Sequence, residues 1–501
     1  MTHPTPEPSR TERDIADDVV ARVLARAGTA VDEGSTIHTS ADGEQLDLVE
    51  RAALRRVVGL STELEDVTEV EYRQLRLEKV VLVGLWYGRS SLDAEISLRE
   101  LAALAETAGS EVLDGLLQRR QTPDPATYLG KGKSAQLAEI VAAVGADTVI
   151  IDGELAPSQR RALEDVVKVK VIDRTALILD IFAQHAKSRE GKAQVELAQL
   201  EYLLPRLRGW GESMSRQAGG QVGGAGAGMG SRGPGETKIE LDRRRIRDRM
   251  AKLRREIAAM APGREAKRAS RKKGKVPAVA IAGYTNAGKS SLLNAITGAG
   301  VLVENALFAT LDPTVRRTQT ADGRVYTLAD TVGFVRSLPH QLVEAFRSTL
   351  EEVADADLLL HVVDASHPDP EGQIAAVREV LADIPGALDV PEVIVLNKAD
   401  VADPDVVARV RGRERRTLVV SAHTGHGIPE LLAYIAAALP RPDRDIDLTV
   451  PYTRGDLVHR MHHEGEIDLE EHTPTGTRLR GRAGEALATE LEAAAVAHST
   501  S

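Results

Sequence analysis

The sequence predicts an α/β protein in which two layered α/β domains are joined by a helical hairpin and followed by a small α+β domain. Three observations support this prediction. Apolar runs alternate with amphipathic stretches over residues 46–190 and again over 276–441. Residues 191–275, between these two regions, have the apolar spacing of paired helices, and a strand-rich tail covers 442–501. Residues 1–45 are polar and Pro-rich, and we expect them to be disordered.

The composition indicates a globular protein of several domains. At 501 residues the chain exceeds what one core accommodates, and 42% of it is hydrophobic and 28% charged. No apolar run reaches about 18 residues, which predicts no membrane span, and the first ten residues lack the apolar core of a signal peptide. The absence of cysteine excludes disulfides and thiolate metal sites. An aromatic content of 3% excludes base stacking as the main mode of nucleic-acid contact.

The first α/β domain is predicted from four strands that alternate with four helices. The expected strands are Lys79–Trp86, Glu111–Gln118, Thr148–Asp152 and Lys170–Asp173. The expected helices are Leu98–Ala108, Ser134–Val144, Pro157–Val166 and Thr175–His185. In the C-terminal domain we expect strands at Asp447–Val450, Glu466–Glu471 and Thr477–Gly481 around a helix at Arg454–His463.

Two segments have apolar residues at alternating spacings of four and three, which predicts an antiparallel coiled-coil hairpin. The first seam comprises Ala193, Leu197, Leu200, Leu204 and Leu207, and the second comprises Ile239, Ile246, Met250, Leu253, Ile257 and Met260. Nine of the eighteen residues from Ala218 to Gly235 are glycine, and the nearby charged residues are mostly arginine. Such a stretch is either a flexible linker or a tip that probes RNA. Its position at the end of a rigid hairpin favours the tip.

The net charge of −11 conceals one strongly basic segment. From Leu241 to Lys275 there are fifteen Lys/Arg against four Asp/Glu, a local charge of +11, so the rest of the chain carries −22. Such a segment is typical of local contact with a polyanion, and equally of a solvated helical face. From Pro262 to Lys275 we expect a polar, basic linker.

Residues 283–290 have the sequence of a phosphate-binding loop. An apolar strand runs into Gly283-Tyr-Thr-Asn-Ala-Gly-Lys-Ser290, and a helical pattern follows at once. The glycines allow the backbone to wrap around phosphate groups, with successive amides pointing inward at the helix N-terminus. Lys289 is then expected to reach the β- and γ-phosphates, and Ser290 to bind Mg²⁺.

Three further motifs follow at the ends of predicted strands, in the order that a guanine nucleotide site requires. Asp330-Thr-Val-Gly333 offers a carboxylate that can hold Mg²⁺ through water and an amide for the γ-phosphate. In Asn397-Lys-Ala-Asp400 the Asp400 carboxylate matches the N1–H and 2-amino donors of guanine, which adenine lacks. Ser421-Ala422 is placed to present an amide to guanine O6. Together the motifs predict a P-loop GTPase domain.

The segment Phe308–Pro313 is expected to sense the γ-phosphate, with Thr310 favoured over Thr314 as the second Mg²⁺ ligand. Many GTPases carry a Gln after the Asp-x-x-Gly motif that orients the attacking water, and this chain has Phe334 there. Because Phe can neither donate nor accept a hydrogen bond, we expect slow hydrolysis without an activating partner. Asn286 resembles a residue of GTPases that use K⁺ in place of an arginine finger; alternatively, it only shapes the loop.

These motifs identify candidate site residues. We expect Lys289, Thr310 and Gly333 to act in catalysis, and Ser290 and Thr310 to bind the metal. The predicted nucleotide-binding residues are Gly283, Tyr284, Thr285, Asn286, Ala287, Gly288, Lys289, Ser290, Phe308, Ala309, Thr310, Leu311, Asp312, Asp330, Thr331, Val332, Gly333, Asn397, Lys398, Ala399, Asp400, Ser421, Ala422 and His423.

The hairpin, the tip ending Gly233-Pro-Gly-Glu-Thr237 and the motifs Phe-Ala-Thr-Leu-Asp, Asp-Thr-Val-Gly-Phe and Asn-Lys-Ala-Asp together resemble the HflX family of ribosome-associated GTPases. The runs Arg174–His185 and Tyr128–Lys133 also match its pattern. The resemblance covers residues 46–481. The long Gly/Ala-rich segment between residues 209 and 233 departs from a minimal tip.

The resemblance implies a protein that binds the large ribosomal subunit and its rRNA in the GTP form, with the hairpin tip in the peptidyl-transferase region. Members of the family split stalled or idle ribosomes, and the ribosome stimulates their GTP hydrolysis. The arginines expected to contact RNA are Arg206, Arg208, Arg216, Arg232, Arg243, Arg244 and Arg245. The absence of cysteine makes a cytoplasmic location the default expectation, and the family's old association with a membrane protease adds a membrane-associated fraction. We expect a monomer because no second exposed seam is evident.

Three other functions stay open on the sequence alone. A ribosome-assembly GTPase would use the same basic hairpin, whereas a signalling switch that recruits a protein partner would not need it. An ATP-dependent RNA remodeller would require the loop Leu129–Ser134 to bind a second nucleotide. That loop precedes a helix, but Thr127 stands where the phosphate-loop motif has its first glycine.

Overall fold

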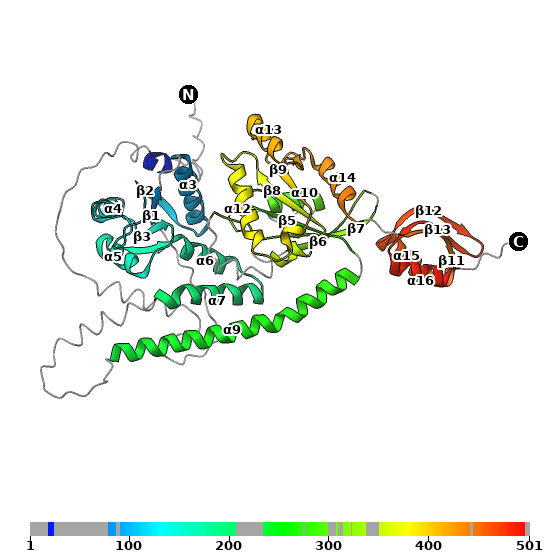
Figure 1. Cartoon of the computed structure of the whole chain (residues 1–501), viewed down its shortest axis with the longest axis horizontal. Helices are drawn as coiled ribbons and strands as arrows, with labels where there is room; N and C mark the ends of the chain where they lie inside the picture. The colour runs from blue at the N-terminus through cyan, green and yellow to red at the C-terminus, as the bar shows by residue number, and fades with distance from the viewer. Residues whose placement is uncertain are drawn as a thin grey trace, which may run out of the picture. The chain divides into compact units, whose positions relative to one another are not determined.

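The computed structural model describes residues 19–24, 79–86, 91–206, 234–273, 276–298, 307–308, 314–321, 323–336, 350–440 and 444–495. The chain divides into two compact units, which separate between Glu256 and Ile257 (Figure 1). The first unit contains one described sheet and the second contains two. None of the described helices combines the length and the hydropathy needed to cross a bilayer.

The first unit contains a four-stranded parallel sheet with the order β2-β1-β3-β4. Its strands are β1 (Lys79–Trp86), β2 (Glu111–Arg119), β3 (Thr148–Asp152) and β4 (Lys170–Asp173). Its helices are α3 (Ser91–Thr107), α4 (Lys131–Val144), α5 (Pro157–Val167) and α6 (Arg174–His185). Helices α3 and α6 contact each other on one face of the sheet, and α4 and α5 contact each other on the other face. The predicted strand–helix alternation is therefore confirmed.

A short helix at residues 19–24 contradicts the expectation that the whole of residues 1–45 is disordered. Val19, Val20 and Val23 are buried, and Val23 packs against Gly115 of β2. The prediction failed because it averaged composition over 45 residues, and the apolar run Val19–Leu24 was diluted by polar neighbours.

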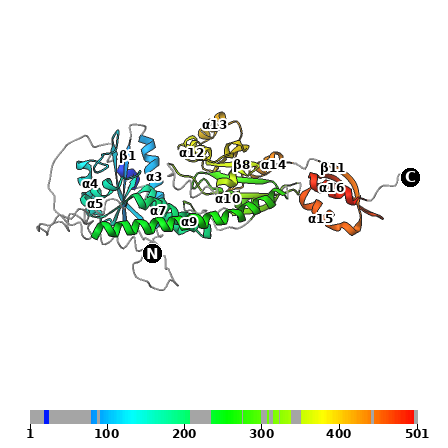
Figure 2. The same cartoon turned by 60° about the horizontal axis from the view of Figure 1, so that its bottom comes forward.

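The two helices of the hairpin are α7 (Arg189–Arg206) and α9 (Pro234–Lys273), which lie side by side in Figures 1 and 2. Seam residues from both helices are buried, namely Ala193, Leu200, Ile246, Met250 and Leu253. Arg249 donates two hydrogen bonds of 2.6 and 2.7 Å to Glu196, and Arg254 lies 2.8 Å from Glu201. In heptad notation the first pair joins two g positions and the second joins two e positions, which fits antiparallel helices.

Helix α9 continues beyond the point where a basic linker was expected to begin. Pro262 lies inside the helix, which runs on to Lys273. A proline removes one backbone donor but leaves the helical bonds on either side available. The following residues are mostly Ala, Arg, Lys and Glu, which favour helix, so the segment stays helical and the linker prediction is wrong for residues 262–273.

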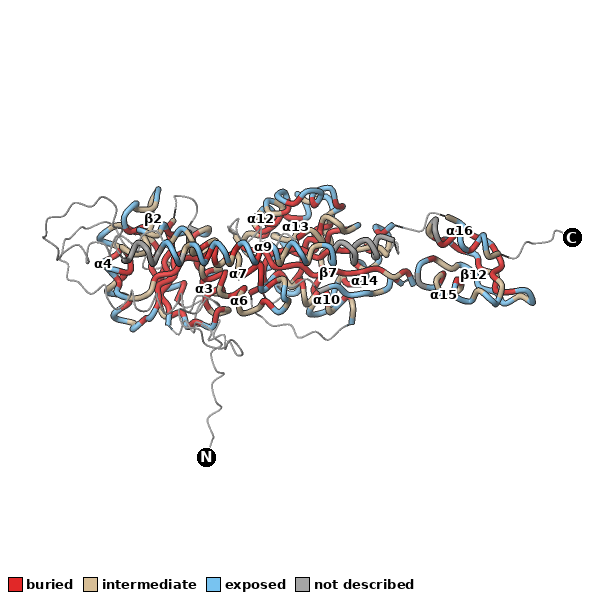
Figure 3. The backbone as a smooth tube through the Cα atoms, turned by 90° about the horizontal axis from the view of Figure 1, so that it is seen from below, coloured by how far each residue is buried: buried red, intermediate tan, exposed pale blue. Residues whose placement is uncertain are grey.

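The second unit contains a six-stranded sheet with the order β10-β9-β8-β5-β7-β6, in which only β6 runs antiparallel to its neighbour. Its strands are β5 (Ala278–Gly283), β6 (Thr314–Gln319), β7 (Val325–Asp330), β8 (Leu358–Asp364), β9 (Glu392–Asn397) and β10 (Thr417–Val419). Its helical segments are α10 (Lys289–Thr297), α12 (Pro370–Ala382), η3 (Ala387–Asp389), α13 (Pro404–Arg413) and α14 (Ile428–Ala438). Every residue of β8 is buried. Figure 3 marks the buried stretches of the trace in red.

The C-terminal segment forms a three-stranded antiparallel sheet with the order β11-β13-β12. Its elements are β11 (Arg444–Val450), η4 (Tyr452–Arg454), α15 (Gly455–Glu464), β12 (Glu466–Thr473), β13 (Gly476–Ala483) and α16 (Glu485–Ala494). The predicted strands and the first helix are confirmed. Helix α16 was not predicted, yet it completes the core through Leu487 and Leu491, which pack with Leu457 and Met461.

Candidate functional site

The carboxyl ends of neighbouring parallel strands bring the predicted loops together in the second unit. Strand β5 ends at Gly283, and α10 begins at Lys289, so the phosphate loop spans the gap between a strand and a helix N-terminus. Parallel sheets of this kind bind ligands at this edge. The other predicted motifs follow β7, β9 and β10 at the same edge.

The side chain of Lys289 is buried inside the phosphate loop. Its Nζ donates a 2.9 Å hydrogen bond to the carbonyl of Tyr284, five residues earlier. Burial lowers the pKa of Lys289 to about 8, an effect that the nearby Asp330 carboxylate partly opposes. A lysine held in this way places positive charge at the centre of a loop of inward-facing amides.

We expect nucleotide affinity to fall as the pH rises above about 8, because Lys289 of the free protein loses its proton there. Bound phosphates favour the charged form, so they raise the pKa of Lys289, and binding then takes up protons. Calorimetric titration with GDP at pH 8.5, in two buffers of different ionisation enthalpy, measures this uptake. The same titration at pH 7.2 should show little proton uptake, because Lys289 is already protonated in the free protein at that pH. Equal uptake at the two pH values would contradict the assignment.

Oxygen donors suited to a divalent cation meet beside the loop. Ser290 Oγ donates a 2.9 Å hydrogen bond to Asp330 Oδ2, at the carboxyl end of β7. The next residue, Thr331, donates to the carbonyl of Ile281 at 2.8 Å, which anchors the Asp-Thr-Val-Gly segment to β5. A hydroxyl and a carboxylate are the kinds of ligand that Mg²⁺ prefers.

Phe334 has a buried side chain, and its backbone is hydrogen-bonded to the phosphate loop. Its side chain is only 2% exposed. Its carbonyl accepts a 2.7 Å hydrogen bond from the Thr285 amide, and its own amide donates to Gly283 at 3.1 Å. The residue that replaces the usual Gln therefore fixes the backbone between the phosphate loop and the Asp-x-x-Gly segment.

The side chain of Asn397 joins three loops of the site. Its Nδ2 donates to the carbonyl of Ala287 in the phosphate loop at 2.8 Å. Its Oδ1 accepts from the Ala422 amide at 3.0 Å. Because Asn397 is buried, these bonds set the distance between the phosphate loop and the predicted base-reading loops.

The Asp400 carboxylate has a fixed orientation. Ser421 Oγ donates a 2.6 Å hydrogen bond to Asp400 Oδ1, and this bond is the main reason that the pKa of Asp400 lies below its usual value. His423 Nδ1 lies 4.0 Å from the other oxygen. The carboxylate is therefore ionised at neutral pH and accepts hydrogen bonds only, as recognition of guanine N1–H and its 2-amino group requires.

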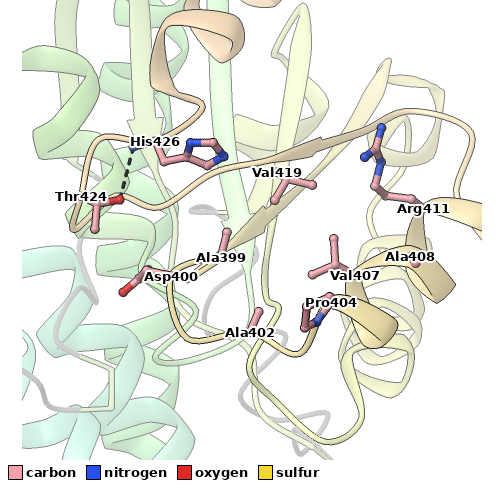
Figure 4. Close-up of a pocket in the computed structure, with 10 residues that line it drawn as sticks. All are labelled: Ala399, Asp400, Ala402, Pro404, Val407, Ala408, Arg411, Val419, Thr424 and His426. Atoms are coloured by element: carbon pink, nitrogen blue, oxygen red, sulfur yellow. Dashed lines mark hydrogen bonds between the residues drawn. The ribbon is translucent and has the colours of Figure 1, made fainter.

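A cavity of about 520 Å³ lies next to the base-reading loop, between α13 and the segment after β10 (Figure 4). Its walls are mostly apolar, with Ala399, Ala402, Pro404, Val407, Ala408 and Val419 joined by Asp400, Arg411, Thr424 and His426. Figure 4 shows the Asp400 carboxylate pointing away from Val407 and Arg411. The cavity therefore adjoins the base-reading loop, whose Asp400 forms one edge of it.

Several predicted residues lie outside the described part of the chain. They are Ala309, Thr310, Leu311 and Asp312 of the γ-phosphate sensor and Arg208, Arg216 and Arg232 of the predicted RNA contacts. Phe308 is described and buried. Of the described arginines on α9, Arg244 and Arg245 are exposed and Arg243 is half-buried.

Arg206 does not fit its predicted role as an RNA contact. Its guanidinium lies 3.1 Å from Asp173 Oδ2 and 3.2 Å from the carbonyl of Leu155, and it stacks 3.4 Å from the centre of the Tyr202 ring. Tyr202 also donates to Asp173 at 2.8 Å. Arg206 therefore anchors the end of α7 to the sheet, and charge alone could not distinguish this role from RNA contact.

Two contacts of the site were not predicted. Lys398 Nζ lies 2.6 Å from Asp364 Oδ2, and Arg336 lies 3.3 Å from Asp369. Asp364 is the last residue of β8 and Asp369 follows that strand, whose pattern was not separately identified. An acidic residue at the end of an apolar strand, Asp364-Ala-Ser366, was the available signal.

The loop before α4 uses its own polar groups. Thr127 Oγ1 accepts a 3.0 Å hydrogen bond from the Gly130 amide, and Asp124 Oδ1 accepts from the amides of Ala126 and Thr127. Of these three amides only that of Gly130 lies in the segment Leu129–Ser134, so the bonds take one donor away from a second phosphate site there.

Comparison with known proteins gives a consistent result. Three family models match: one described as GTP-binding GTPase N-terminal over residues 95–183, one described as GTP-binding GTPase middle region over 185–271, and one described as 50S ribosome-binding GTPase over 278–398. GTPase HflX of Caldanaerobacter subterraneus subsp. tengcongensis is 44% identical over 403 residues, which are 80% of this chain and 90% of that protein.

GTPase HflX of Escherichia coli K12 is 44% identical over 397 residues, 78% of this chain and 90% of its own length. A solved structure of a GTP-binding protein from the archaeon Sulfolobus solfataricus with GDP covers 72% of this chain and 98% of its own, at 26% identity and a TM-score of 0.39. The level and extent of identity to the bacterial relatives establish a GTP-hydrolysing enzyme, and the chain belongs to the HflX family of GTPases.

Proposed function

We propose that this GTPase binds the large ribosomal subunit in its GTP form and separates stalled or idle ribosomes into subunits. The observation that carries the proposal is the presence, in one chain, of a guanine nucleotide site and a 40-residue basic helix, in which most of the arginines with described side chains are exposed. The match to a family model described as 50S ribosome-binding GTPase supports the choice of partner.

In this proposal the nucleotide is held by the phosphate loop and read by the loops after β9 and β10. Lys289 neutralises the β- and γ-phosphates, and the Gly333 amide meets the γ-phosphate. Asp400 accepts hydrogen bonds from the guanine. Ser290 and Thr310 would hold Mg²⁺, which supplies charge neutralisation between the phosphates; the Ser290–Asp330 geometry fits such an ion.

The protein lacks a Gln at the position that usually orients the attacking water, so the ribosome must complete the catalytic arrangement. Because Phe334 is buried and pinned through its backbone, it cannot turn to serve this purpose. Asn286 has a left-handed backbone and is exposed, and its side chain forms no hydrogen bond with any described residue, which leaves its amide oxygen available for K⁺. Equal ribosome-stimulated rates in KCl and NaCl would exclude the potassium role.

Exposed arginines of α9 provide the RNA-binding face in this proposal. Arg249 and Arg254 are excluded from it because they bind acids of α7. Replacing Arg244 and Arg247, both exposed, by Glu should weaken binding to the large subunit and lower the salt dependence of affinity by about one unit of slope per lost phosphate contact. Sedimentation at several salt concentrations measures both effects.

The matched control is Arg415→Glu, which makes the same charge change as Arg244→Glu or Arg247→Glu alone, at an exposed residue outside α9. If the control weakens binding as much as the α9 variants, net charge alone explains the effect and the assigned face is wrong.

The splitting activity can be tested by light scattering of intact ribosomes mixed with the protein. GTP and a non-hydrolysable analogue should both support separation, because the GTP form binds, whereas GDP should not. Separation that is equally fast with GDP, or absent with every nucleotide, would contradict the proposal. An assembly GTPase would instead leave intact ribosomes unchanged and bind precursor subunits.

A further inference from the structure

The carboxyl ends of β8 and β9 lie side by side in the GTPase sheet. The two strands are parallel, and their register pairs Asp364 with Asn397. The backbone continues this pairing for one residue, because the Ala365 amide donates to the carbonyl of Asn397 at 2.9 Å. The loop that follows β8 is therefore fixed against the loop that reads the base.

Asp364 uses both of its carboxylate oxygens. Oδ2 lies 2.6 Å from Lys398 Nζ, and Oδ1 accepts from the amide and the hydroxyl of Ser366 at 2.9 and 2.5 Å. Asp364 is 9% exposed, and the Lys398 side chain is 29% exposed. A largely buried carboxylate with three donors has one orientation, so it holds the lysine ammonium at one place.

Lys398 occupies a position from which it can form part of the nucleotide site. It lies between Asn397, which is bonded to the phosphate loop, and Asp400, the predicted reader of guanine. Its backbone is left-handed, with φ of 61°, so the side chain leaves the loop in a direction that ordinary extended backbone would not give. With the ammonium bound to Asp364, the methylene stem is fixed and offers an apolar surface to a planar base.

We infer that Asp364 is a positioning residue for guanine nucleotide binding, which acts by holding the ammonium of Lys398 so that the stem of Lys398 supports the base beside Asp400. Ser366 assists by fixing the carboxylate. This role concerns the affinity for nucleotide and not the chemical step, because the contacts lie at the base-reading end of the site.

Loss of the Asp364 carboxylate has two opposing effects. It frees the Lys398 ammonium, and an additional positive charge attracts a polyanionic nucleotide. That attraction acts over the length of the nucleotide and is screened within about 8 Å at physiological salt. The hydrogen bond between Asp364 and Lys398 acts at short range, where salt does not screen it. Without this bond the Lys398 side chain can adopt many rotamers. The loss of positioning therefore outweighs the gain in charge.

The test measures the dissociation constants of fluorescent GDP and GTP for Asp364→Asn, Lys398→Met and the double variant. Lys398→Met keeps an unbranched stem and removes the ammonium. Both single variants should raise the two constants together by about tenfold, which corresponds to about 1.4 kcal/mol. In the double variant, Asp364→Asn should add less than twofold, because the ammonium on which it acts is gone.

Two further variants test whether loss of affinity results only from destabilisation of the fold. Glu392→Gln removes a carboxylate from the opposite end of β9, where it binds His361 and Arg378 at 2.6 and 2.7 Å; it should lower the unfolding temperature without changing either constant. Ser366→Ala leaves the Asp364–Lys398 pair in place and should weaken GDP binding by a few-fold, which keeps the test available if Asp364→Asn does not fold. Unchanged affinity in Asp364→Asn, or a full tenfold loss from it in the Lys398→Met background, would overturn the inference.

Discussion

Replacing Asp400 by Asn is expected to change the preferred nucleotide from GTP to XTP. An Asn amide can accept only one of the two guanine hydrogen bonds, and its NH₂ group faces the 2-amino group of guanine. Xanthine carries an oxygen at that position, which accepts a hydrogen bond from the Asn NH₂. Two hydrogen bonds to a charged group contribute about 3–4 kcal/mol together, so GTP binding should weaken by about 100- to 1000-fold and XTP binding should improve.

The orientation of the residue makes this exchange feasible. Ser421 fixes one oxygen of Asp400 at 2.6 Å, which leaves the other side of the group for the base. The change is measured by how well GTP and XTP each compete with a fluorescent nucleotide for the site. Asp403→Asn is the matched control, because Asp403 is exposed three residues later and caps α13 through the Asp405 amide at 2.9 Å, a role that Asn can also fill. A loss of GTP affinity without a gain for XTP would contradict the role of Asp400 as base reader.

Replacing Gly288 by Ala is expected to abolish nucleotide binding, with at least a 100-fold loss of affinity. The backbone of Gly288 is left-handed, with φ of 87°, and an added Cβ would lie 2.3 Å from Asn397 Nδ2. The methyl group would therefore push Asn397 away from the phosphate loop and break its 2.8 Å bond to Ala287. Strain of the left-handed backbone adds about 1–2 kcal/mol. Equilibrium binding of fluorescent GDP, with an unfolding curve for the same sample, measures the result.

Gly298→Ala is the control that introduces left-handed backbone strain without a contact to Asn397. Gly298 lies at the other end of α10 and is also left-handed, with φ of 66°, but an added Cβ meets nothing within 4 Å. This control should cost about 1 kcal/mol of unfolding free energy and leave nucleotide affinity unchanged. If both alanines reduce affinity equally, the Asn397 link is not the reason that Gly288 is required.

The elements that could be predicted are those whose local sequence pattern matches the way they are buried in the fold. Strands β1 and β3 are short, largely buried apolar runs rich in Val and Ile, and the predicted bounds of both agree with the structure. Helix α16 was missed because Ala and Glu dominate it and its apolar face is defined only by the sheet it covers. The extension of α9 past Pro262 was missed because a proline changes one helical turn without ending the helix.

In the site, too, features set by local sequence could be predicted and features set by tertiary packing could not. The four motifs could be recognised because the chemistry of phosphate and guanine fixes both residue type and spacing. The ion pairs Lys398–Asp364 and Arg206–Asp173 could not be predicted, because each joins residues more than 30 positions apart whose proximity depends on strand order. Charge identified the basic helix, but only packing distinguishes Arg249, which binds Glu196, from the exposed Arg244.

The most direct test of the ribosome proposal is the rate of GTP hydrolysis by the purified protein, alone and with large ribosomal subunits, for the full chain and for a variant lacking residues 218–233. The proposal predicts slow hydrolysis alone, stimulation by the subunits of about tenfold or more, and loss of that stimulation in the variant while its GDP affinity is unchanged. A rate that does not respond to large subunits would contradict the proposal, and the nucleotide site would then serve a different partner.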